Sequence, residues 1–449
     1  MVRAAAIVAG LGFTVAGFVS ARSRVPSGSA SRAETVAPVL PLIVDLDAPS
    51  TVLPVRNDRY GSALCLVMRD GDPIAKTRVD LDGDELLSCD LLRHMASQPP
   101  RSGGDPKQAA GTVTVQAAAI STMAPCAGVT VVIATRNRPD QLVQCVTSVL
   151  SGTIAPDRVV VVDNAPSGDR AAELVSRLAE HDLRITYVRE DRPGLANAHN
   201  AALPHLAGEV VAFTDDDVLV HQRWLERLVR AFADDQQVVC VTGMIAPREL
   251  DTLPQQWVEG QAIYDKGLQR RVFDTGAHRP DDPLFPYTAG ALGSGANMAF
   301  RADYLTASGG FDTALGAGTL AMGGDDLAAF YDVVRSGHRL VYEPSAIVLH
   351  EHHREWSALR RQVYGYGAGL GAHLTRCLLR DPRTAWVLLR NGRATSRRAT
   401  QILHPSIGDG LPPYPQELSR EQRRGLMSGP WRYLLSRNRA RIARRKALQ

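Results

Sequence analysis

The stretch VVAFTDDD at Val210–Asp217 decides the fold, because a short apolar run ends abruptly in three carboxylates. A run of this length and composition predicts a buried strand. Like charges at the tip of a strand repel one another, and burial removes their hydration. A bound cation offsets both costs. Mg²⁺ suits this place, because it takes few protein carboxylates and fills its other positions with water and substrate phosphates. The stretch therefore predicts a metal–diphosphate site at a strand end.

A structural explanation of the same carboxylates remains. Asp is a common N-cap and favours the first turn of a helix, and a helical pattern follows at residues 221–233. One Asp would need no further explanation. Three in a row, directly after a strand, favour the metal site.

Strands and helices alternate on both sides of this stretch. Apolar strand patterns occupy residues 129–134, 159–162, 185–188, 210–214 and 238–241, with helical patterns between them. This alternation predicts an α/β fold with a doubly wound, mainly parallel sheet. Ligands bind such sheets outside the carboxyl ends of the strands. Thr135, the pair Asp163–Asn164 and the Asp215–Asp217 cluster follow three of these strands, so we expect them to share one rim.

Composition fits a globular protein of several domains: the chain has 449 residues, 45% apolar content and a net charge of +4. That charge is too small to indicate a nucleic-acid partner. Six scattered cysteines with no CxxC pair indicate neither a disulfide framework nor a zinc site, and favour a reducing compartment. We expect five segments: an apolar leader and linker (1–37), a small α+β module (38–98), a linker (99–126), a catalytic domain (127–353) and a helical, basic C-terminal region (354–449).

Both ends of the chain leave alternatives open. The apolar stretch Ala4–Ala21 is a signal peptide, a short membrane anchor or translated upstream sequence, and the arginines after it favour a cytoplasmic location for the rest. The module at 38–98 contains a hairpin pattern around the turn Arg69–Asp72, and a short helix is expected at 84–96.

Apolar and Arg residues from Trp356 to Arg380 form either an amphipathic helix on an anionic membrane or a helix packed on the catalytic domain. The basic run Arg437–Lys446 suits acidic lipid heads or a solvated end.

Seven motifs in a fixed order resemble the family 2 glycosyltransferases, which are inverting enzymes of the GT-A fold that use nucleotide-diphosphate sugars. The motifs are VVIATRNRP (131–139), VVVDN (160–164), RPGLANAHN (192–200), FTDDD (213–217), GGFD (309–312), GDDL (324–327) and VLH (348–350). The resemblance covers Gly128–His353, about half of the chain.

The resemblance implies a role for each matching residue. The donor-binding residues would be Thr135, Arg136, Asp163, Asn164, Gly194, Asn200, Asp215 and Asp216, with Thr135 and Asp163 at the nucleotide base, usually uracil. Asp215, Asp217 and His350 would hold the metal, Mg²⁺ or Mn²⁺. Asp326 would be the general base, with Asp325 in a place often held by Glu, so that either aspartate of this pair can be the base. His199 departs from the family, which often has Arg there.

These roles define a reaction. A cation at Asp217 would stabilise the charge of the departing nucleotide diphosphate, and Asp326 would take the proton of the acceptor hydroxyl. One base without a second nucleophile gives displacement with inversion. We therefore expect a metal-dependent glycosyltransferase that moves a sugar, favouring a UDP-sugar, to a glycan or lipid-linked acceptor in cell-envelope or polysaccharide biosynthesis. We expect it in the cytoplasm, with peripheral association with the inner face of an anionic membrane.

Other functions also place aspartates at strand ends. A sugar-1-phosphate nucleotidyltransferase needs a Gly-rich, basic phosphate loop after the first strand, which Thr135–Pro139 lacks. A receiver-like signalling domain would leave the motifs after residue 290 without a purpose. A non-catalytic nucleotide-sugar or glycan-binding protein remains as an alternative.

Overall fold

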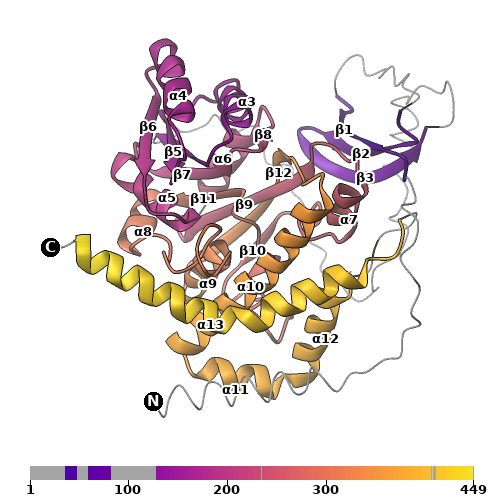
Figure 1. Cartoon of the computed structure of the whole chain (residues 1–449). Helices are drawn as coiled ribbons and strands as arrows, with labels where there is room; N and C mark the ends of the chain where they lie inside the picture. Colours follow the sequence, from indigo (N-terminus) through magenta and orange to yellow (C-terminus); the bar gives the residue numbers. More distant parts are fainter. Residues whose placement is uncertain are drawn as a thin grey trace.

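The computed structural model describes residues 36–47, 59–81, 128–233, 235–405, 407 and 411–447. Figure 1 shows a small sheet, a large central sheet flanked by helices, and a group of C-terminal helices. The leader up to residue 35, the linker 99–126 and the helix expected at 84–96 lie outside the described residues.

The central sheet contains nine strands in the order β10-β12-β9-β11-β7-β4-β5-β6, with β8 paired to β12. The strands are β4 (Val129–Thr135), β5 (Arg158–Asn164), β6 (Ile185–Glu190), β7 (Val210–Asp215), β8 (Val218–Val220), β9 (Val238–Pro247), β10 (Arg271–Phe273), β11 (Asn297–Arg301) and β12 (Arg339–His350). The predicted α/β class is confirmed, and β6, β5, β4 and β7 are parallel as expected. The whole sheet is mixed, because β11 runs antiparallel between β7 and β9.

Helices cover both faces of this sheet. They are α3 (Pro139–Leu150), α4 (Arg170–His181), α5 (Leu195–Ala202), α6 (Trp224–Ala233), α8 (Ala302–Ala307) and α9 (Asp325–Arg335). Helix α7 (Leu253–Gly260) packs instead against the C-terminal helices. The burial of strand β4 on both faces explains why most of its residues are apolar. Val131 and Ile133 pack in the core beneath α3, α4 and α6, whereas Val132 and Ala134 pack in the core beneath α5 and α9. A strand covered on both faces has no polar side to present.

The N-terminal module is a three-stranded sheet of β1 (Val39–Asp45), β2 (Ser62–Arg69) and β3 (Asp72–Asp80). Strands β2 and β3 form the expected hairpin, and β1 pairs parallel to β2. Leu66 and Met68 of β2 share an apolar cluster with Met244 of β9 and Ile347 of β12. The module therefore packs directly on the central sheet.

The C-terminal region is helical, as predicted, and comprises α10 (Trp356–Arg380), α11 (Arg383–Arg390), α12 (Gly392–Leu403) and α13 (Gln416–Ala447). Helices α10 and α13 cross closely (Figure 1). A Cβ atom on Gly425 would lie 2.1 Å from the carbonyl oxygen of Tyr364, so only glycine permits this approach. Helix α10 packs on the catalytic domain through the buried Arg376, which binds Asp312 and Asp332. Among the described helices, none is long and apolar enough to cross a membrane.

Candidate functional site

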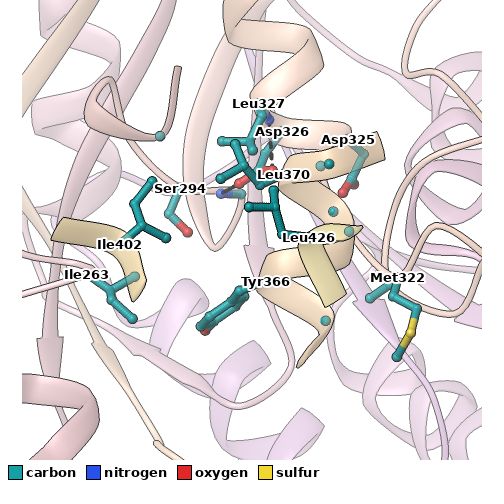
Figure 2. Close-up of a pocket in the computed structure, with 18 of the residues that line it drawn as sticks. Ile263, Ser294, Met322, Asp325, Asp326, Leu327, Tyr366, Leu370, Ile402 and Leu426 are labelled. Carbon is teal, nitrogen blue, oxygen red and sulfur yellow. Dashed lines mark hydrogen bonds between the residues drawn. The ribbon is translucent and has the colours of Figure 1, made fainter. Parts of the chain in front are cut away.

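One large cavity of about 2990 Å³ opens at the carboxyl ends of β4 and β7 and extends to α10–α13. Its lining includes the predicted residues Thr135, Arg136, Asn164, Asp215, Asp216, Asp217, Asp325, Asp326 and His350. In Figure 2, Asp325 and Asp326 stand at the start of α9, and Tyr366 of α10 faces the same space. Two acidic clusters more than a hundred residues apart in sequence therefore share one chamber.

The first acidic cluster is the tip of β7. Asp216 is buried and accepts hydrogen bonds from the Thr135 hydroxyl at 2.8 Å and from Arg138 Nη1 at 3.1 Å. The same Arg138 nitrogen donates to Asp217 Oδ2 at 2.7 Å. Burial, followed by Asp217 and Asp216, raises the pKa of Asp215 well above its ordinary range. One arginine therefore does not balance the charge of this tip.

Three ligand atoms converge beside this tip. Asp215, Asp217 and His350 each offer one atom, and these atoms all lie within 4.8 Å of one another. Asp217 Oδ1 is buried, has no hydrogen-bond partner among the described residues, and lies 3.6 Å from His350 Nε2. Burial lowers the pKa of His350 to about 4, so its imidazole is neutral and can act as a ligand. Two carboxylates and an imidazole fit a divalent cation such as Mn²⁺.

The second acidic cluster opens α9. Gly324 has a φ of +85° and turns the chain so that Asp325 and Asp326 begin the helix. Asp326 Oδ1 accepts the Leu327 amide at 2.8 Å and Oδ2 accepts the Gly295 amide at 3.1 Å. Burial, followed by Asp326, raises the pKa of Asp325 to about 7, and burial also raises that of Asp326.

The two carboxylates of this pair face different surroundings. In Figure 2, Asp326 lies beside Ser294, whereas Asp325 lies on the side of Met322. The negative charge of Asp325 helps to raise the pKa of Asp215 at the β7 tip. The positive charge of Lys266 acts on Asp326 and lowers its pKa, against the effect of burial. Both carboxyls of the pair still have a raised pKa, as a proton acceptor near neutral pH requires.

The expected donor residues divide between the cavity wall and its support. Asn164 lines the cavity, and its side chain also binds the Gly194 amide and the Arg192 carbonyl, at 2.8 and 2.9 Å. Asp163 is fully buried and accepts a hydrogen bond from Tyr187 at 3.0 Å. Its Oδ1 atom lacks a partner within the described part of the chain. Asp163 stands next to the lining rather than in it.

Gly194 and Asn200 differ from expectation, because the described lining contains neither. The Asn200 amide is occupied by the backbone of Phe311: its Nδ2 donates to the carbonyl and its Oδ1 accepts the amide, both at 2.8 Å. Gly194 has a φ of +133°, and a Cβ there would meet Thr319 at 2.7 Å. Both residues therefore hold loops around the cavity.

His199, which departs from the family pattern, belongs to the core. Its ring packs 4.8 Å from the Phe213 ring and 4.9 Å from the Phe311 ring, measured between centroids. Burial lowers its pKa to about 3. The side chain is therefore a neutral core histidine, and not a cationic substitute for arginine.

Sequence reasoning missed several cavity residues. Arg138 lay inside a recognised motif, so its charge next to three aspartates was an available signal. Tyr264 and Lys266 follow α7 in a segment without periodicity, and nothing in the sequence singles them out. The Tyr264 hydroxyl lies 2.5 Å from that of Tyr366, which ties this segment to α10. Burial, followed by Arg398, lowers the pKa of Lys266 to about 8.

Comparison with known proteins agrees with this geometry. Residues 130–292 match the profile of the family described as Glycosyl transferase family 2. A "Pre-mycofactocin glycosyltransferase" of Mycobacterium tuberculosis is 29% identical over 294 residues, which are 61% of this chain and 55% of the relative. A "Glucosyl-dolichyl phosphate glucuronosyltransferase" of Haloferax volcanii is 26% identical over 253 residues, covering 53% of this chain and 75% of the relative. The chain thus spans about half the length of the mycobacterial relative.

Among solved structures, a mannosyltransferase from Pyrobaculum calidifontis in complex with GDP-Man and Mn²⁺ is similar with a TM-score of 0.46 and 21% identity. The match covers 68% of this chain and 88% of that chain. GalNAc-T7 with UDP, GalNAc and Mn²⁺ is similar with a TM-score of 0.42 and 16% identity, over 61% of this chain and 58% of that one.

Proposed function

The chain carries a domain of glycosyl transferase family 2, and we propose that it moves a sugar from a nucleotide-diphosphate sugar to a hydroxyl group, with a divalent cation and with inversion. One observation carries the proposal: the cation-binding group Asp215, Asp217 and His350 lines the same cavity as the acidic pair Asp325 and Asp326. A leaving-group site and a proton acceptor in one chamber suit a single displacement.

The leaving group belongs at the β7 tip. Asp215, Asp217 and His350 would hold Mg²⁺ or Mn²⁺, and this cation, when bound, would offset the charge of the departing nucleotide diphosphate. Arg138 orients Asp217 through its 2.7 Å hydrogen bond and adds a positive charge near the same position. The protein therefore supplies both the cation ligands and a fixed cation of its own.

The nucleotide belongs against the ends of β4 and β5. Thr135, Arg136 and Asn164 line this part of the cavity, and the buried Oδ1 of Asp163 beside it has no hydrogen-bond partner among the residues that the structure describes. A carboxylate oxygen accepts a hydrogen bond from the N–H of a base. The N3–H of uracil is such a donor, as are N–H groups of the other bases, so this carboxylate is compatible with the UDP-sugar that the family resemblance favours.

The acceptor belongs at the start of α9. Asp326 would take the proton of the attacking hydroxyl, with Asp325 as its close neighbour. Burial raises the pKa of Asp326 above its ordinary value, which makes its carboxylate a stronger base. General-base catalysis is typically worth about 10²–10⁴-fold. Direct attack by the acceptor hydroxyl in a single displacement inverts the anomeric carbon.

We also propose a lipid-linked acceptor. Beyond α9 the cavity runs between apolar side chains of the C-terminal helices, including Leu378, Leu389, Ile402, Met427 and Trp431. Several large apolar side chains of these helices are well exposed, among them Trp386 at 59%, Leu389 at 61% and Trp431 at 67%. The printed name of the Haloferax relative also includes a dolichyl phosphate.

Basic residues accompany this apolar surface. Arg383 and Arg390 lie on α11, and Arg390 stacks over the Trp386 ring at 4.9 Å. Apolar and cationic side chains together suit an anionic bilayer surface. The described cysteines are free and buried, which agrees with a reducing compartment. We therefore propose a reaction at the cytoplasmic face of a membrane, in the assembly of a cell-envelope glycan or polysaccharide.

The first experiment screens nucleotide sugars for Mn²⁺-dependent thermal stabilisation, because a ligand that binds only the folded protein raises Tm. Donors that stabilise are then tested for Mn²⁺-dependent release of the nucleoside diphosphate, with Asp217→Ala and Asp326→Ala as controls. We expect release by the wild type and its loss in both variants. Stabilisation without release by the wild type would show a binding protein and would contradict catalysis.

A further inference from the structure

A line of polar side chains connects the N-terminal sheet to the cation-binding group. Lys76 of β3 pairs with Glu259 of α7 at 2.5 Å. The other oxygen of Glu259 lies 3.6 Å from His352 Nε2. His352 Nδ1 lies 3.0 Å from His350 Nδ1, and His350 Nε2 faces Asp217 at 3.6 Å. The line begins in a module without an assigned role and ends at a metal ligand.

Each nitrogen of His350 has a defined neighbour. Its Nδ1 is taken by His352, so Nε2 is the atom available beside Asp217. The bond made by the second nitrogen of a ligating histidine fixes the orientation of its ring. Tyr264 packs against both histidines, with 5.5 Å between ring centroids in each case. Rotation of either ring would break these contacts.

His352 depends on Glu259 for its own position. Its side chain is 1% exposed, and its Nε2 has no hydrogen-bond partner among the described residues. That atom faces the Glu259 carboxylate at 3.6 Å. Helix α7 is fixed beside this segment, because Gln255 Nε2 donates to the His352 carbonyl at 3.2 Å. Glu259 is therefore held where it can orient His352.

Lys76 ties the N-terminal sheet into this line. Its ammonium also pairs with Asp265 at 3.2 Å, in the segment that lines the cavity. The sheet is anchored at other points as well: Val39 donates to the Leu250 carbonyl at 3.1 Å, and Arg227 binds Asp72 at 3.2 Å. Lys76 thus extends from a firmly packed strand.

We propose that the N-terminal sheet is part of the metal site: Lys76 and Glu259 position His352, and through it His350, for the cation at Asp215 and Asp217. This inference rests on the proposed function, because it needs a cation at that place. Lys76, Glu259 and His352 are positioning residues in it. The module would then act on metal affinity without touching the cation or the substrates.

The test measures Mn²⁺ binding to the full chain by electron paramagnetic resonance, with Tm recorded for each variant. We expect Glu259→Gln to weaken binding about fivefold, less than the 10- to 100-fold typical of losing the direct partner of a ligating histidine, because Glu259 acts on His350 only through His352. Lys76→Met should weaken it about threefold, as expected for one partly exposed ion pair. Lys76→Arg keeps the cation and should restore binding. Arg78→Met is the matched control, because Arg78 lies on the same strand and binds only Ser62 within the module among its described contacts.

A second readout follows the histidine itself. Spin-echo modulation from a ¹⁴N nucleus should appear in the Mn²⁺ spectrum of the wild type and disappear in His350→Ala. It should weaken in Glu259→Gln at saturating Mn²⁺, whereas loss of folding would change Tm instead. If Glu259→Gln proves unstable, the Mn²⁺ affinities of Lys76→Met and Lys76→Arg are compared instead. Weaker binding in Lys76→Met alone would support the role of the N-terminal sheet, and equal binding in both variants would contradict it.

The outcomes separate the two proposals. Wild-type affinity and ¹⁴N modulation in both Glu259→Gln and Lys76→Met, with binding lost in Asp217→Asn, would overturn the role of the N-terminal sheet and leave the metal site intact. Unchanged Mn²⁺ binding in Asp217→Asn would overturn the metal site, and with it the proposed function and this inference.

Discussion

The tip of β7 and the start of α9 are both acidic, and they differ in how the protein treats the negative charge. At the tip, Asp215, Asp216 and Asp217 stand side by side, with Arg138 as a shared partner. At the helix start, backbone amides of Gly295 and Leu327 hold Asp326. The comparison teaches that one residue type serves two chemistries, according to the partners that the backbone provides.

The physical reason lies in what can neutralise each cluster. Three adjacent carboxylates at a strand end have no helix dipole to favour their ionised form, so a divalent cation is the natural complement. At the helix start, the dipole and the backbone amides favour the ionised form whereas burial opposes it, so these carboxyls can take up and release a proton without a metal. We therefore propose that the first arrangement binds a cation and that the second exchanges a proton.

The largest expected effect comes from the helix start. Asp326→Asn should lower kcat by about 10²–10⁴-fold, because the acceptor proton loses its base, and should leave Mn²⁺ affinity unchanged. The measurement is steady-state transfer together with a Mn²⁺ titration. A larger loss in Asp325→Asn than in Asp326→Asn would exchange the roles of the two residues. Loss of Mn²⁺ binding in either variant would erase the distinction between the clusters.

A substitution at the tip of β7 should lower kcat as well, but it should also affect Mn²⁺ binding. Asp217→Asn should lower kcat by about 10²–10³-fold, the usual effect of removing one charge-stabilising contact, and should also weaken Mn²⁺ binding. Asp169→Asn serves as control, because Asp169 is an exposed carboxylate of the same domain. Activity that is independent of Mn²⁺ or Mg²⁺ in the wild type would refute this assignment.

The pH profile tests the acidic pair as a unit. Burial, and then Asp326, raises the pKa of Asp325 to about 7, so we expect the coupled pair, in which Asp326 is the proposed base, to take up a proton as pH falls through about 7. Below that point kcat should fall about tenfold per pH unit. The Asp325 carboxyl has a pKa of about 3.9 in the unfolded chain, so the folded state binds the proton more tightly. The free energy of unfolding should therefore increase as pH is lowered from about 7 to about 4. Asp325→Asn should reduce both dependences, and profiles that match the wild type would contradict the coupling.

The smallest expected effect is on the binding of a lipid-linked acceptor along the apolar part of the cavity, where Trp431 of α13 lies. Trp431→Ala should raise KM for a lipid-linked acceptor about fivefold, by loss of apolar contact, while KM for the donor stays constant. Leu183→Ala is the matched control, because Leu183 is 95% exposed at a place outside the cavity lining. An equal change in both KM values would mean that Trp431 does not distinguish acceptor from donor.

The sequence was most informative where periodicity and charge coincide. The β7 tip was predictable, because an apolar run followed by three aspartates occupies consecutive positions. The antiparallel strand β11 was not, because it follows a long segment without a helical crossover. The two interpretations of the helix at Trp356–Arg380 differ only in what it packs against. Arg376 looks like a surface charge in the sequence, yet it is 2% exposed and paired with Asp332.

Local motifs also could not reveal contacts that depend on tertiary register. Asn200 belongs to a recognised motif, but its amide is occupied by Phe311, which lies 111 residues away. Lys76 and Glu259 are separated by 183 residues and have no pattern in common. Such pairs arise only when segments that are far apart in the sequence are packed together.

The most direct test of the account is anomalous diffraction at the manganese edge from crystals grown with Mn²⁺ and UDP. The account predicts one strong peak in the cavity, within coordination distance of Asp217 and His350, with the diphosphate on its open side. A peak bound elsewhere, or UDP bound in the cavity with no manganese beside Asp217, would contradict it.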